Sequence, residues 1–437
     1  MQKKTKVLYV LHNHPALHPG GAEAYALELY EALRESDQIE PLLVARIGPN
    51  VASARSSHPG APFSSVNDDP NQYFLYSETD HFDFFMMTSR DKSLYTQHFA
   101  EFLRAHRPDI VHFQHTLFLG YDLVSAVRQI LPDAPIFYTL HEFLPICHRD
   151  GQMLRTNGEL CKHASPRRCN ECFPAIAPQE FFLRERFIKS HLEQVDMFLA
   201  PSQFLLERYV DWGIPRDRIR FEDYGRIREH QIVPDEAPRD GARNRIGFFG
   251  QLNYFKGVNV LMKAMGILDE FDVDAHLWLH GANLELQSQG FQDDFAELLD
   301  DVKSGPDNVT LAGKYAHDDL PRLMAEIDWV VVPSRWWENS PLVIQEAFLH
   351  GRPVICSDIG GMAEKVADGV NGLHFRAGDA RGLARVIERA VKTEGLWQSL
   401  RAGVPEIYDM DDHVASIEQM YGEQLERRAP RAHEVAR

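Results

Sequence analysis

The chain has 437 residues, 44% of them hydrophobic, and a formal net charge of −18. A chain of this length holds two or three domains, each with a hydrophobic core of its own. The acidic balance excludes a protein that binds nucleic acid mainly through the phosphate backbone, because such proteins carry a basic surface. Any phosphate group that the protein binds must therefore be bound locally, by a few basic side chains and backbone amides.

The sequence contains no candidate for a membrane span. No stretch approaches the roughly 20 apolar residues that a spanning helix needs, and the apolar run Val7–Leu11 is too short for a signal peptide. We therefore expect a soluble, cytoplasmic protein. Between His141 and Lys189, eight basic residues face six acidic ones. This segment is interpreted either as a peripheral contact with an anionic membrane surface or as a solvated face of mixed charge.

Apolar runs alternate with helical patterns along the first half of the chain. Strands are expected at Val7–Leu11, Ile110–Phe113, Ile136–Leu140 and Met197–Ala200, and helices at Ala22–Leu33, Leu123–Ile130 and Phe204–Val210. This alternation is typical of a parallel sheet with crossover helices. We assign residues 1–232 to an N-terminal Rossmann-like domain, with a cysteine-rich insertion at about 145–175.

The second half repeats this alternation after a polar stretch, 233–243, that predicts a linker. Strands are expected at Ile246–Gly250, Ala275–Leu279, Val309–Ala312, Trp329–Val332 and Val354–Cys356. Residues 244–410 are assigned to a second Rossmann-like domain, and residues 411–437 to a terminal helix and tail. Ligands of such doubly wound domains bind where the carboxyl ends of strands meet helix N-termini.

Two glutamates, Glu338 and Glu346, flank a predicted transition from strand to helix. Residues 328–333 have the continuous β-branched character of a buried strand. Ser340 and Pro341 have the residue types of a helix N-cap and a first helical position. The unpaired amides and the positive dipole end of this helix predict an anion site. Glu346 then lies about one and a half turns inside the helix, and Glu338 lies in the loop.

This arrangement suits a nucleotide sugar. The amides around Asn339, Ser340 and Leu342 would bind the diphosphate, one carboxylate would bind the ribose hydroxyls, and the other would contact the transferred sugar. The alternative is a capped surface helix that carries two solvated glutamates.

Further motifs accompany the two glutamates. They are Phe248-Phe-Gly250-Gln251-Leu-Asn-Tyr-Phe-Lys256-Gly257, Pro353–Gly361 and Asp368–Leu373, with Gly20-Gly21-Ala22-Glu23 and Thr139-Leu-His141 in the first half. Together they resemble the family 4 glycosyltransferases. That family has the GT-B fold, in which two doubly wound domains face each other across a cleft, and it transfers a sugar from a nucleotide donor with retention of configuration. The helix expected at Asp412–Arg427 resembles the terminal GT-B helix that crosses back to the first domain.

The resemblance gives Lys256 the role of gripping the donor diphosphate, which suits a point charge. Many family members carry arginine at the position of Gln251, so one positive charge is missing here. Arg335 or Arg243 could compensate for it. The alternative for Lys256 is a surface lysine before a glycine that opens a helix.

In the first half, the resemblance places the backbone of Gly20 and Gly21 near the donor phosphate and makes His141 a contact of the donor sugar. Glu142 follows His141 where the family usually has aspartate. A simple turn would explain the two glycines equally well. The chain holds 21 histidines, so position and not residue type distinguishes His141.

The family mechanism is a front-face displacement, in which the leaving diphosphate oxygen helps to deprotonate the acceptor hydroxyl. It needs no catalytic metal and no obligatory protein base, so catalysis is mostly positioning and charge stabilisation. Glu338 would orient the donor sugar, Glu346 would bind the ribose, and Lys256 would stabilise charge on the leaving group. The implied acceptor is a saccharide or lipid-linked saccharide used in surface polysaccharide synthesis. No short sequence motif identifies the donor base, the donor sugar or the oligomeric state.

Two other functions stay open. Gln251 favours a degenerate transferase that binds a nucleotide sugar, or a partner, without turnover. A GT-B-type epimerase acting on the nucleotide sugar itself is the second alternative.

Four of the five cysteines are close together in the sequence. Cys147, Cys161, Cys169 and Cys172 are separated by thirteen, seven and two residues. Four thiols that end in Cys-x-x-Cys suit a closed structural zinc site. The alternatives are free thiols, an iron–sulfur cluster and disulfides, of which disulfides are disfavoured in the cytoplasm. Cys356 is expected to be an ordinary core residue.

Overall fold

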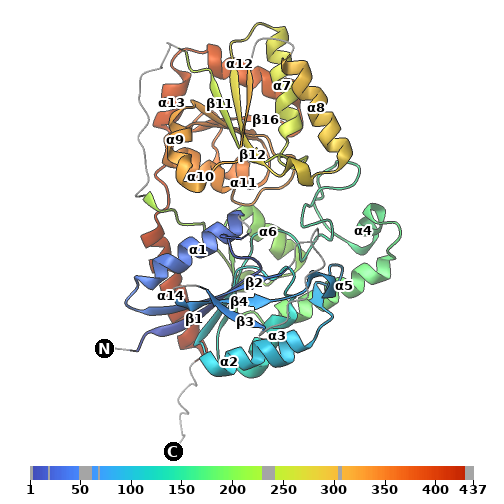
Figure 1. Ribbon diagram of the computed structural model, residues 1–437, viewed down its shortest axis with the longest axis vertical. Coiled ribbons are helices and arrows are strands. Elements are labelled where there is room, and N and C mark those ends of the chain that lie inside the picture. The colour runs from blue at the N-terminus through green and yellow to red at the C-terminus, as the bar shows by residue number, and fades with distance from the viewer. Residues whose placement is uncertain are drawn as a thin grey trace, which may run out of the picture. The chain divides into compact units, whose positions relative to one another are not determined.

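The computed structural model describes residues 3–17, 20–48, 62–66, 69–228, 242–303 and 308–428. The chain divides into two compact units, one formed by Met1–Gly225 with Met410–Arg437 and the other by Arg226–Asp409 (Figure 1). Each unit is built around a mainly parallel sheet with helices between its strands. This confirms the predicted fold class of two Rossmann-like domains. Most of the predicted linker, residues 233–241, lies outside the described residues.

The first unit contains an eight-stranded sheet in the order β10-β9-β8-β7-β1-β2-β4-β3. Its strands are β1 (Thr5–Leu11), β2 (Ile39–Ile47), β3 (Phe63–Val66), β4 (Asp69–Tyr76), β7 (Ile110–Phe113), β8 (Ile136–Thr139), β9 (Met197–Ala200) and β10 (Ile219–Phe221). Neighbouring strands are parallel except for β3 and β4. Two short strands, β5 (Phe82–Asp83) and β6 (Thr88–Ser89), form a separate antiparallel pair.

Helices of the first unit follow these strands. They are α1 (Gly21–Arg34), α2 (Ala100–His106), α3 (Asp122–Ile130), α4 (Pro166–Cys172), α5 (Pro178–Leu192) and α6 (Gln203–Trp212). The C-terminal helix α14 (Met410–Arg428) also belongs to this unit and packs beside α1. The prediction that the terminal helix crosses back to the first domain is therefore confirmed.

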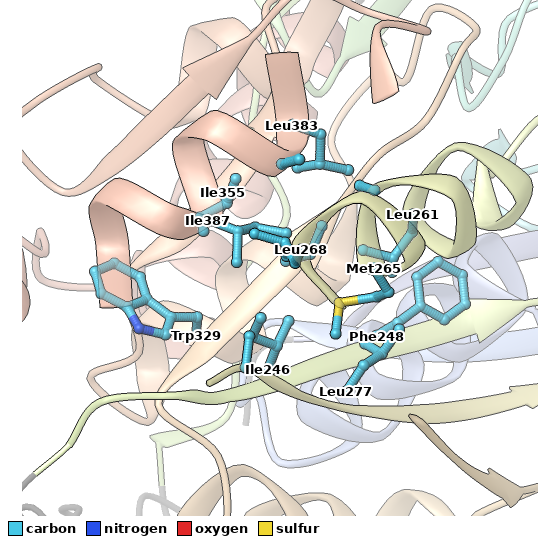
Figure 2. Packing of buried hydrophobic residues seen from close by; sticks show 14 of the residues in the cluster. Ile246, Phe248, Leu261, Met265, Leu268, Leu277, Trp329, Ile355, Leu383 and Ile387 are labelled. Carbon is cyan, nitrogen blue, oxygen red and sulfur yellow. The ribbon is translucent and has the colours of Figure 1, made fainter. Parts of the chain in front are cut away.

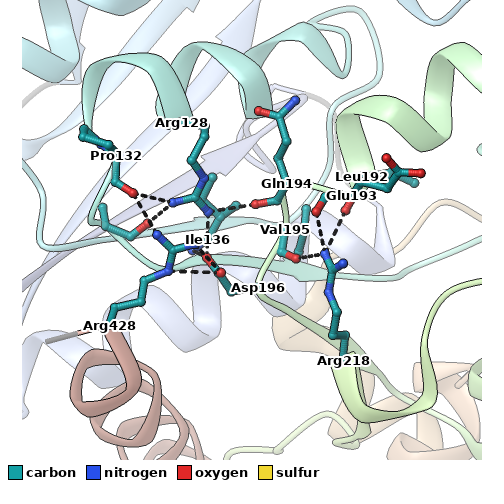
Figure 3. Close-up of polar contacts among 11 residues, drawn as sticks. Arg128, Pro132, Ile136, Leu192, Glu193, Gln194, Val195, Asp196, Arg218 and Arg428 are labelled. Atoms are coloured by element: carbon teal, nitrogen blue, oxygen red, sulfur yellow. Dashed lines mark hydrogen bonds and ion pairs between the residues drawn. The ribbon is translucent and has the colours of Figure 1, made fainter. Parts of the chain in front are cut away.

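Buried polar contacts fasten α14 to the first sheet. The hydroxyl of Tyr421 lies 2.6 Å from the hydroxyl of Tyr9 and 2.6 Å from Nδ1 of His112. At the far end of the helix, Arg428 and Arg128 both contact Asp196, whose carboxylate also accepts a hydrogen bond from the Ile136 amide (Figure 3). Because α14 contributes these groups from the end of the chain, the first unit is complete only when the C-terminus is present.

His112 makes the first unit sensitive to acid. The side chain is fully buried, and Nε2 lies 2.8 Å from Oγ1 of Thr139. Burial lowers its pKa from 6.5 to about 3. Because the folded pKa lies below the unfolded one, this contribution to stability is complete above pH 6.5 and is lost as the pH falls toward 3. At pH 4 the loss is about 3 kcal/mol.

We therefore expect His112→Gln to flatten the dependence of the unfolding free energy on pH between 7 and 4. Urea denaturation at both pH values measures this dependence. Replacing the exposed His81 by glutamine is the matched control and should leave the wild-type dependence unchanged. An equally steep acid loss in His112→Gln would contradict the assignment to His112.

The second unit contains a six-stranded parallel sheet in the order β13-β12-β11-β14-β15-β16. Its strands are β11 (Arg245–Gln251), β12 (His276–Ala282), β13 (Val309–Gly313), β14 (Trp329–Val332), β15 (Val354–Ser357) and β16 (Gly372–Phe375). Its helices are α7 (Val258–Glu270), α8 (Gln289–Lys303), α9 (Leu320–Ala325), α10 (Leu342–Leu349), α11 (Gly360–Lys365), α12 (Ala380–Lys392) and α13 (Leu396–Ala402). The five predicted strands are present, and β16 adds a sixth.

Two hydrophobic clusters cover the two faces of this sheet. On β14, Trp329 and Val331 join the cluster with α7 and α12, of which Figure 2 shows a part that includes Trp329. Val330 and Val332 join the other cluster, with α9 and α10. Alternate residues of a strand point to opposite faces. Because both faces are covered, β14 is apolar throughout, and polar groups lie beyond its two ends.

Candidate functional site

The loop that follows β14, residues 333–341, is held between two glycines. Gly257 has a left-handed φ of +71°, and a Cβ atom there would lie 1.9 Å from the carbonyl oxygen of Pro333. A Cβ atom at Gly361 would lie 1.5 Å from the carbonyl oxygen of Asn339. The Gly361 amide donates to the Glu338 carbonyl over 2.7 Å. Only glycine permits such close approach of backbones, so these two residues fix the path of the loop.

The carboxylate of Glu338 is the most strongly bonded group of this loop. Its Oε1 accepts hydrogen bonds from Nζ of Lys256 at 2.7 Å, Oγ of Ser334 at 2.7 Å and Nε1 of Trp336 at 2.9 Å. The residue is only 6% exposed. An ammonium group has three donors, so Lys256 can hold Glu338 and still donate to phosphate oxygens.

Glu346 lies in the fifth position of α10, about one turn inside the helix. It is buried, and its Oε1 lies 3.3 Å from Nη2 of the buried Arg226. The helix begins at Leu342 with Pro341 as its N-cap residue. The prediction that Ser340 caps the helix and Pro341 is its first residue was therefore wrong by one position. Proline has no side-chain acceptor, so Pro341 caps α10 only through its backbone: its carbonyl accepts from the Ile344 amide over 3.0 Å.

The two arginines considered as substitutes for the missing charge at Gln251 lie in different places. Gln251 is exposed at the carboxyl end of β11. Arg243 precedes β11, pairs with Asp328 over 3.0 Å and stacks on Trp397. Because the length of β11 separates Arg243 from Gln251, the suggestion that Arg243 compensates was wrong.

Arg335 is the remaining candidate for that compensation. Its amide donates to the carbonyl of Phe255 over 2.8 Å, and its guanidinium lies 4.1 Å from the centre of the Tyr254 ring. Both partners belong to the loop between Gln251 and Gly257. Arg335 therefore lies beside the loop that carries Lys256.

In the first unit, Gly20 and Gly21 lie where α1 begins. Gly20 is the N-cap residue with an extended backbone, and a Cβ atom there would lie 2.4 Å from Oε2 of Glu23. Oε1 of Glu23 lies 3.0 Å from Nε2 of His12, which follows β1. Burial lowers the pKa of His12 to about 4. Burial alone would raise the pKa of Glu23, but the hydrogen bond from His12 brings it below its ordinary value. A neutral His12 therefore faces an ionised Glu23.

His141 lies beyond the carboxyl end of β8. Its Nδ1 lies 2.6 Å from the hydroxyl of Tyr224, and its Nε2 lies 3.1 Å from Oε1 of Gln114. Burial, with the nearby His115, lowers the pKa of His141 well below its ordinary value. The ring is therefore neutral, and its orientation is fixed by two polar neighbours.

Some polar residues of these sites were missed by sequence reasoning. Ser334 carries no motif beyond its place after β14. Arg226 is separated from Glu346 by 120 residues, and His115 contacts Glu142 over 3.4 Å. The one sequence signal that could have identified these residues is a polar residue directly after a predicted strand. Ser334 and His115 show this signal, and Arg226 does not.

The four clustered cysteines line one cavity of the first unit. The cavity has a volume of about 20 Å³. Burial raises the pKa of the Cys147 and Cys161 thiols, and raises that of Cys169 to about 11. All five cysteines are described, and none of them forms a disulfide. With the side chains in these conformations, the described ranges contain no group of three or more His, Cys, Asp or Glu residues that could hold a metal ion.

Two Rossmann-like units and a helix that returns from the end of the second unit to the first are the features of the GT-B fold. Residues 19–221 match the glycosyltransferase family 4 model, and residues 243–393 match the model for glycosyl transferases group 1. The chain belongs to the family 4 glycosyltransferases. The described part of the chain contains no helix long and apolar enough to span a membrane.

Curated relatives carry related names. D-inositol 3-phosphate glycosyltransferase 1 of Catenulispora acidiphila is 31% identical over 38% of this chain and 42% of its own. The lipopolysaccharide core biosynthesis glycosyltransferase LpsE of Rhizobium meliloti is 29% identical over 47% of this chain and 57% of its own. The chain thus spans about half the length of such relatives.

Solved structures match over nearly the whole chain. Sucrose-phosphate synthase from Thermosynechococcus elongatus has a TM-score of 0.69 at 18% identity and covers 97% of this chain and 100% of its own. The Anabaena protein HepE, in complex with UDP and glucose, has a TM-score of 0.65 at 17% identity and covers 96% of this chain and 99% of its own. At these identities the likeness shows the shared GT-B fold.

Proposed function

We propose that this chain is a retaining glycosyltransferase that moves a sugar, of the hexose type, from a nucleotide-sugar donor to a saccharide or lipid-linked saccharide. The observation that carries the proposal is the loop after β14. It holds Glu338 against Lys256 and leads into α10, which carries Glu346. A cation, a helix N-terminus and two buried carboxylates on one segment provide complementary groups for a diphosphate, a ribose and a sugar.

Each group of the donor site has a role in this proposal. Glu346 accepts hydrogen bonds from the ribose hydroxyls, while Arg226 orients its carboxylate. Glu338, fixed by its three donors, orients the hydroxyls of the transferred sugar. Lys256 stabilises negative charge on the departing diphosphate, together with amides of Asn339, Ser340 and Leu342. The exposed Gln251 adds a neutral donor, and Arg335 supplies the missing charge.

The first unit contributes neutral groups in the proposal. His141 does not titrate near neutral pH, so it serves as a hydrogen-bond partner for the donor sugar and not as a general base. The acceptor hydroxyl then passes its proton to the leaving diphosphate oxygen as the new glycosidic bond forms and the donor bond breaks. Gly20 and Gly21 bring bare backbone to the N-terminus of α1, which suits a phosphate neighbour.

The names of the relatives support a surface saccharide as the acceptor. They include LpsE and the amylovoran biosynthesis glycosyltransferase AmsK of Erwinia amylovora, which is 25% identical over 48% of this chain. Acceptors of this kind are assembled at the inner face of a membrane. We therefore expect the protein to act in the cytoplasm, in peripheral contact with that membrane.

The test is an analysis of products from UDP-, GDP-, ADP- and TDP-sugars by NMR. We expect one donor to be consumed and its sugar to appear first in the anomeric configuration of the donor. An inverted product would contradict retention. Conversion of the donor to an epimeric nucleotide sugar without acceptor would favour an epimerase, and failure to consume any donor would favour a degenerate binding protein.

A further inference from the structure

The four clustered cysteines belong to a small subdomain whose buried apolar residues, among them Leu154, all precede Arg155. It comprises residues 142–173, between β8 and α5, and includes α4. The helix α4 has no buried residue. Elements of this kind lack the apolar burial that usually holds short helices in place. Its contacts are instead polar: Glu171 pairs with Arg155, and Asn170 donates to the Ile176 carbonyl over 2.9 Å.

Three separate segments bring the thiols to one place. Cys147 ends a turn in which its amide donates to the Phe143 carbonyl over 2.7 Å. Cys161 follows a short hairpin, closed by a bridge between Leu154 and Leu160, and its amide donates to Met153. Cys169 and Cys172 lie three positions apart on α4, so they share one face of the helix.

The backbone between these segments is tightly turned. Asp150 and Met153 both adopt left-handed conformations, with φ of +46° and +48°. Such backbone is costly for residues other than glycine. It persists only where the surroundings hold it, which favours a strong tie in the segment between Cys147 and Cys161.

The cavity that the four thiols share suits a single ion. Its volume of about 20 Å³ holds roughly one water-sized body. An iron–sulfur cluster of several atoms would need a larger space. Tetrahedral coordination by four thiolates is the usual form of structural zinc.

The charge around the cavity is also complementary to that of a zinc ion bound by four thiolates. Four thiolates and one Zn²⁺ ion form a complex with a net charge of −2. Arg149, Arg155 and Arg168 line the same cavity. Buried charge needs compensation of this kind. Arg155 also pairs with Glu171, and Arg149 also donates to the carbonyls of Leu154 and Arg155.

We propose that Cys147, Cys161, Cys169 and Cys172 bind one structural Zn²⁺ ion. The four thiols release four protons, form four sulfur–zinc bonds and undergo no oxidation or reduction. Because the side chains as they stand do not form a closed metal group, the thiols rotate toward the centre of the cavity when the ion binds. The ion fixes the segment that begins directly after His141, and it takes no part in sugar transfer.

Structural contacts carry this effect toward His141. Arg184 donates to the carbonyls of Leu144 and Pro145 over 2.6 and 2.8 Å. The hydroxyl of Tyr209 donates to the carbonyl of Glu142 over 2.7 Å. These bonds anchor one end of the segment, and the zinc ion anchors the other.

The test is metal analysis of the untagged, full-length protein after growth with added zinc. We expect one zinc ion per chain, and its loss in the variant Cys172→Ala. The matched control is Cys356→Ala, because Cys356 lies in β15 of the other unit and should leave the zinc content unchanged. A second readout is replacement of zinc by cobalt, which should give the intense thiolate-to-cobalt absorption of a four-sulfur site in the wild type.

Three outcomes would overturn the proposal. In the first, the wild-type protein contains no bound metal and gives no thiolate-to-cobalt absorption, so it has no site formed by four thiolates. Iron and acid-labile sulfide would show a cluster in place of zinc. Disulfide-linked peptides among the four cysteines, found by mass spectrometry of protein purified without reductant, would assign the thiols to covalent pairs. The cobalt and wild-type measurements remain decisive even if Cys172→Ala fails to fold.

Discussion

Glu346→Ala should weaken the binding of the nucleotide donor by about 100-fold or more, with little effect on turnover once the donor is saturating. The carboxylate of Glu346 makes two hydrogen bonds to ribose hydroxyls in our proposal, and a hydrogen bond to a carboxylate contributes about 1.5–3 kcal/mol. These bonds are present equally in the ground state and the transition state. Their loss therefore changes affinity and leaves kcat largely unchanged.

The change at Glu346 also affects the fold, because it removes a partner of the buried Arg226. Removing one partner of a buried ion pair costs about 3–5 kcal/mol, so stability must be measured together with affinity. Glu346→Gln preserves the shape and should show an intermediate loss of affinity. Glu388→Ala, in the exposed pair with Lys392 on α12, is the control and should bind normally. Unchanged affinity in a folded Glu346→Ala variant would exclude the ribose-binding role.

Glu338→Gln should lower kcat by about 100- to 1,000-fold while donor affinity changes less than tenfold. Loss of one preorganised polar group at a reacting centre has an effect of this size. The neutral amide keeps the shape of the side chain, but it weakens the bond to Lys256 and no longer orients the sugar hydroxyls as a charged acceptor. Release of nucleoside diphosphate at saturating donor measures kcat directly.

Ser334→Ala is the matched control for Glu338. It removes one of the three donors to the same oxygen and leaves the carboxylate and Lys256 in place. We expect a loss of kcat below tenfold. If Glu338→Gln turns over as fast as Ser334→Ala, the carboxylate does not orient the donor sugar. Negligible losses from the changes at both Glu338 and Glu346 would remove the donor-site assignment.

The α/β class was predictable because the strands buried on both faces stand out as apolar runs. Strand β2 was missed because Pro41 interrupts its run, and proline within a run argues against a strand. The four-residue β16 contains Gly372 and His374, so it lacked the apolar signal. Helix α10 was placed one residue early because Ser-Pro has the residue types of a cap and a first turn, whereas the structure uses Pro341 itself at the cap.

The donor-site residues were predictable where they belong to motifs at strand ends. Lys256 and Glu338 were both identified from sequence, but their contact depends on two loops that meet at Gly257. The partners Ser334 and Arg226 belong to no motif. Arg243 was misjudged because sequence proximity to Gln251 gives no information about which end of β11 a side chain occupies.

The most direct test of the central claim is thermal unfolding of the wild-type protein with UDP, GDP, ADP and TDP, each in excess. A ligand at a hundredfold over its dissociation constant adds about 2.7 kcal/mol to stability. We predict that one nucleotide raises the unfolding temperature and that Glu346→Gln reduces this shift. If no nucleotide stabilises the folded wild-type protein, the proposed donor site on the second unit is contradicted.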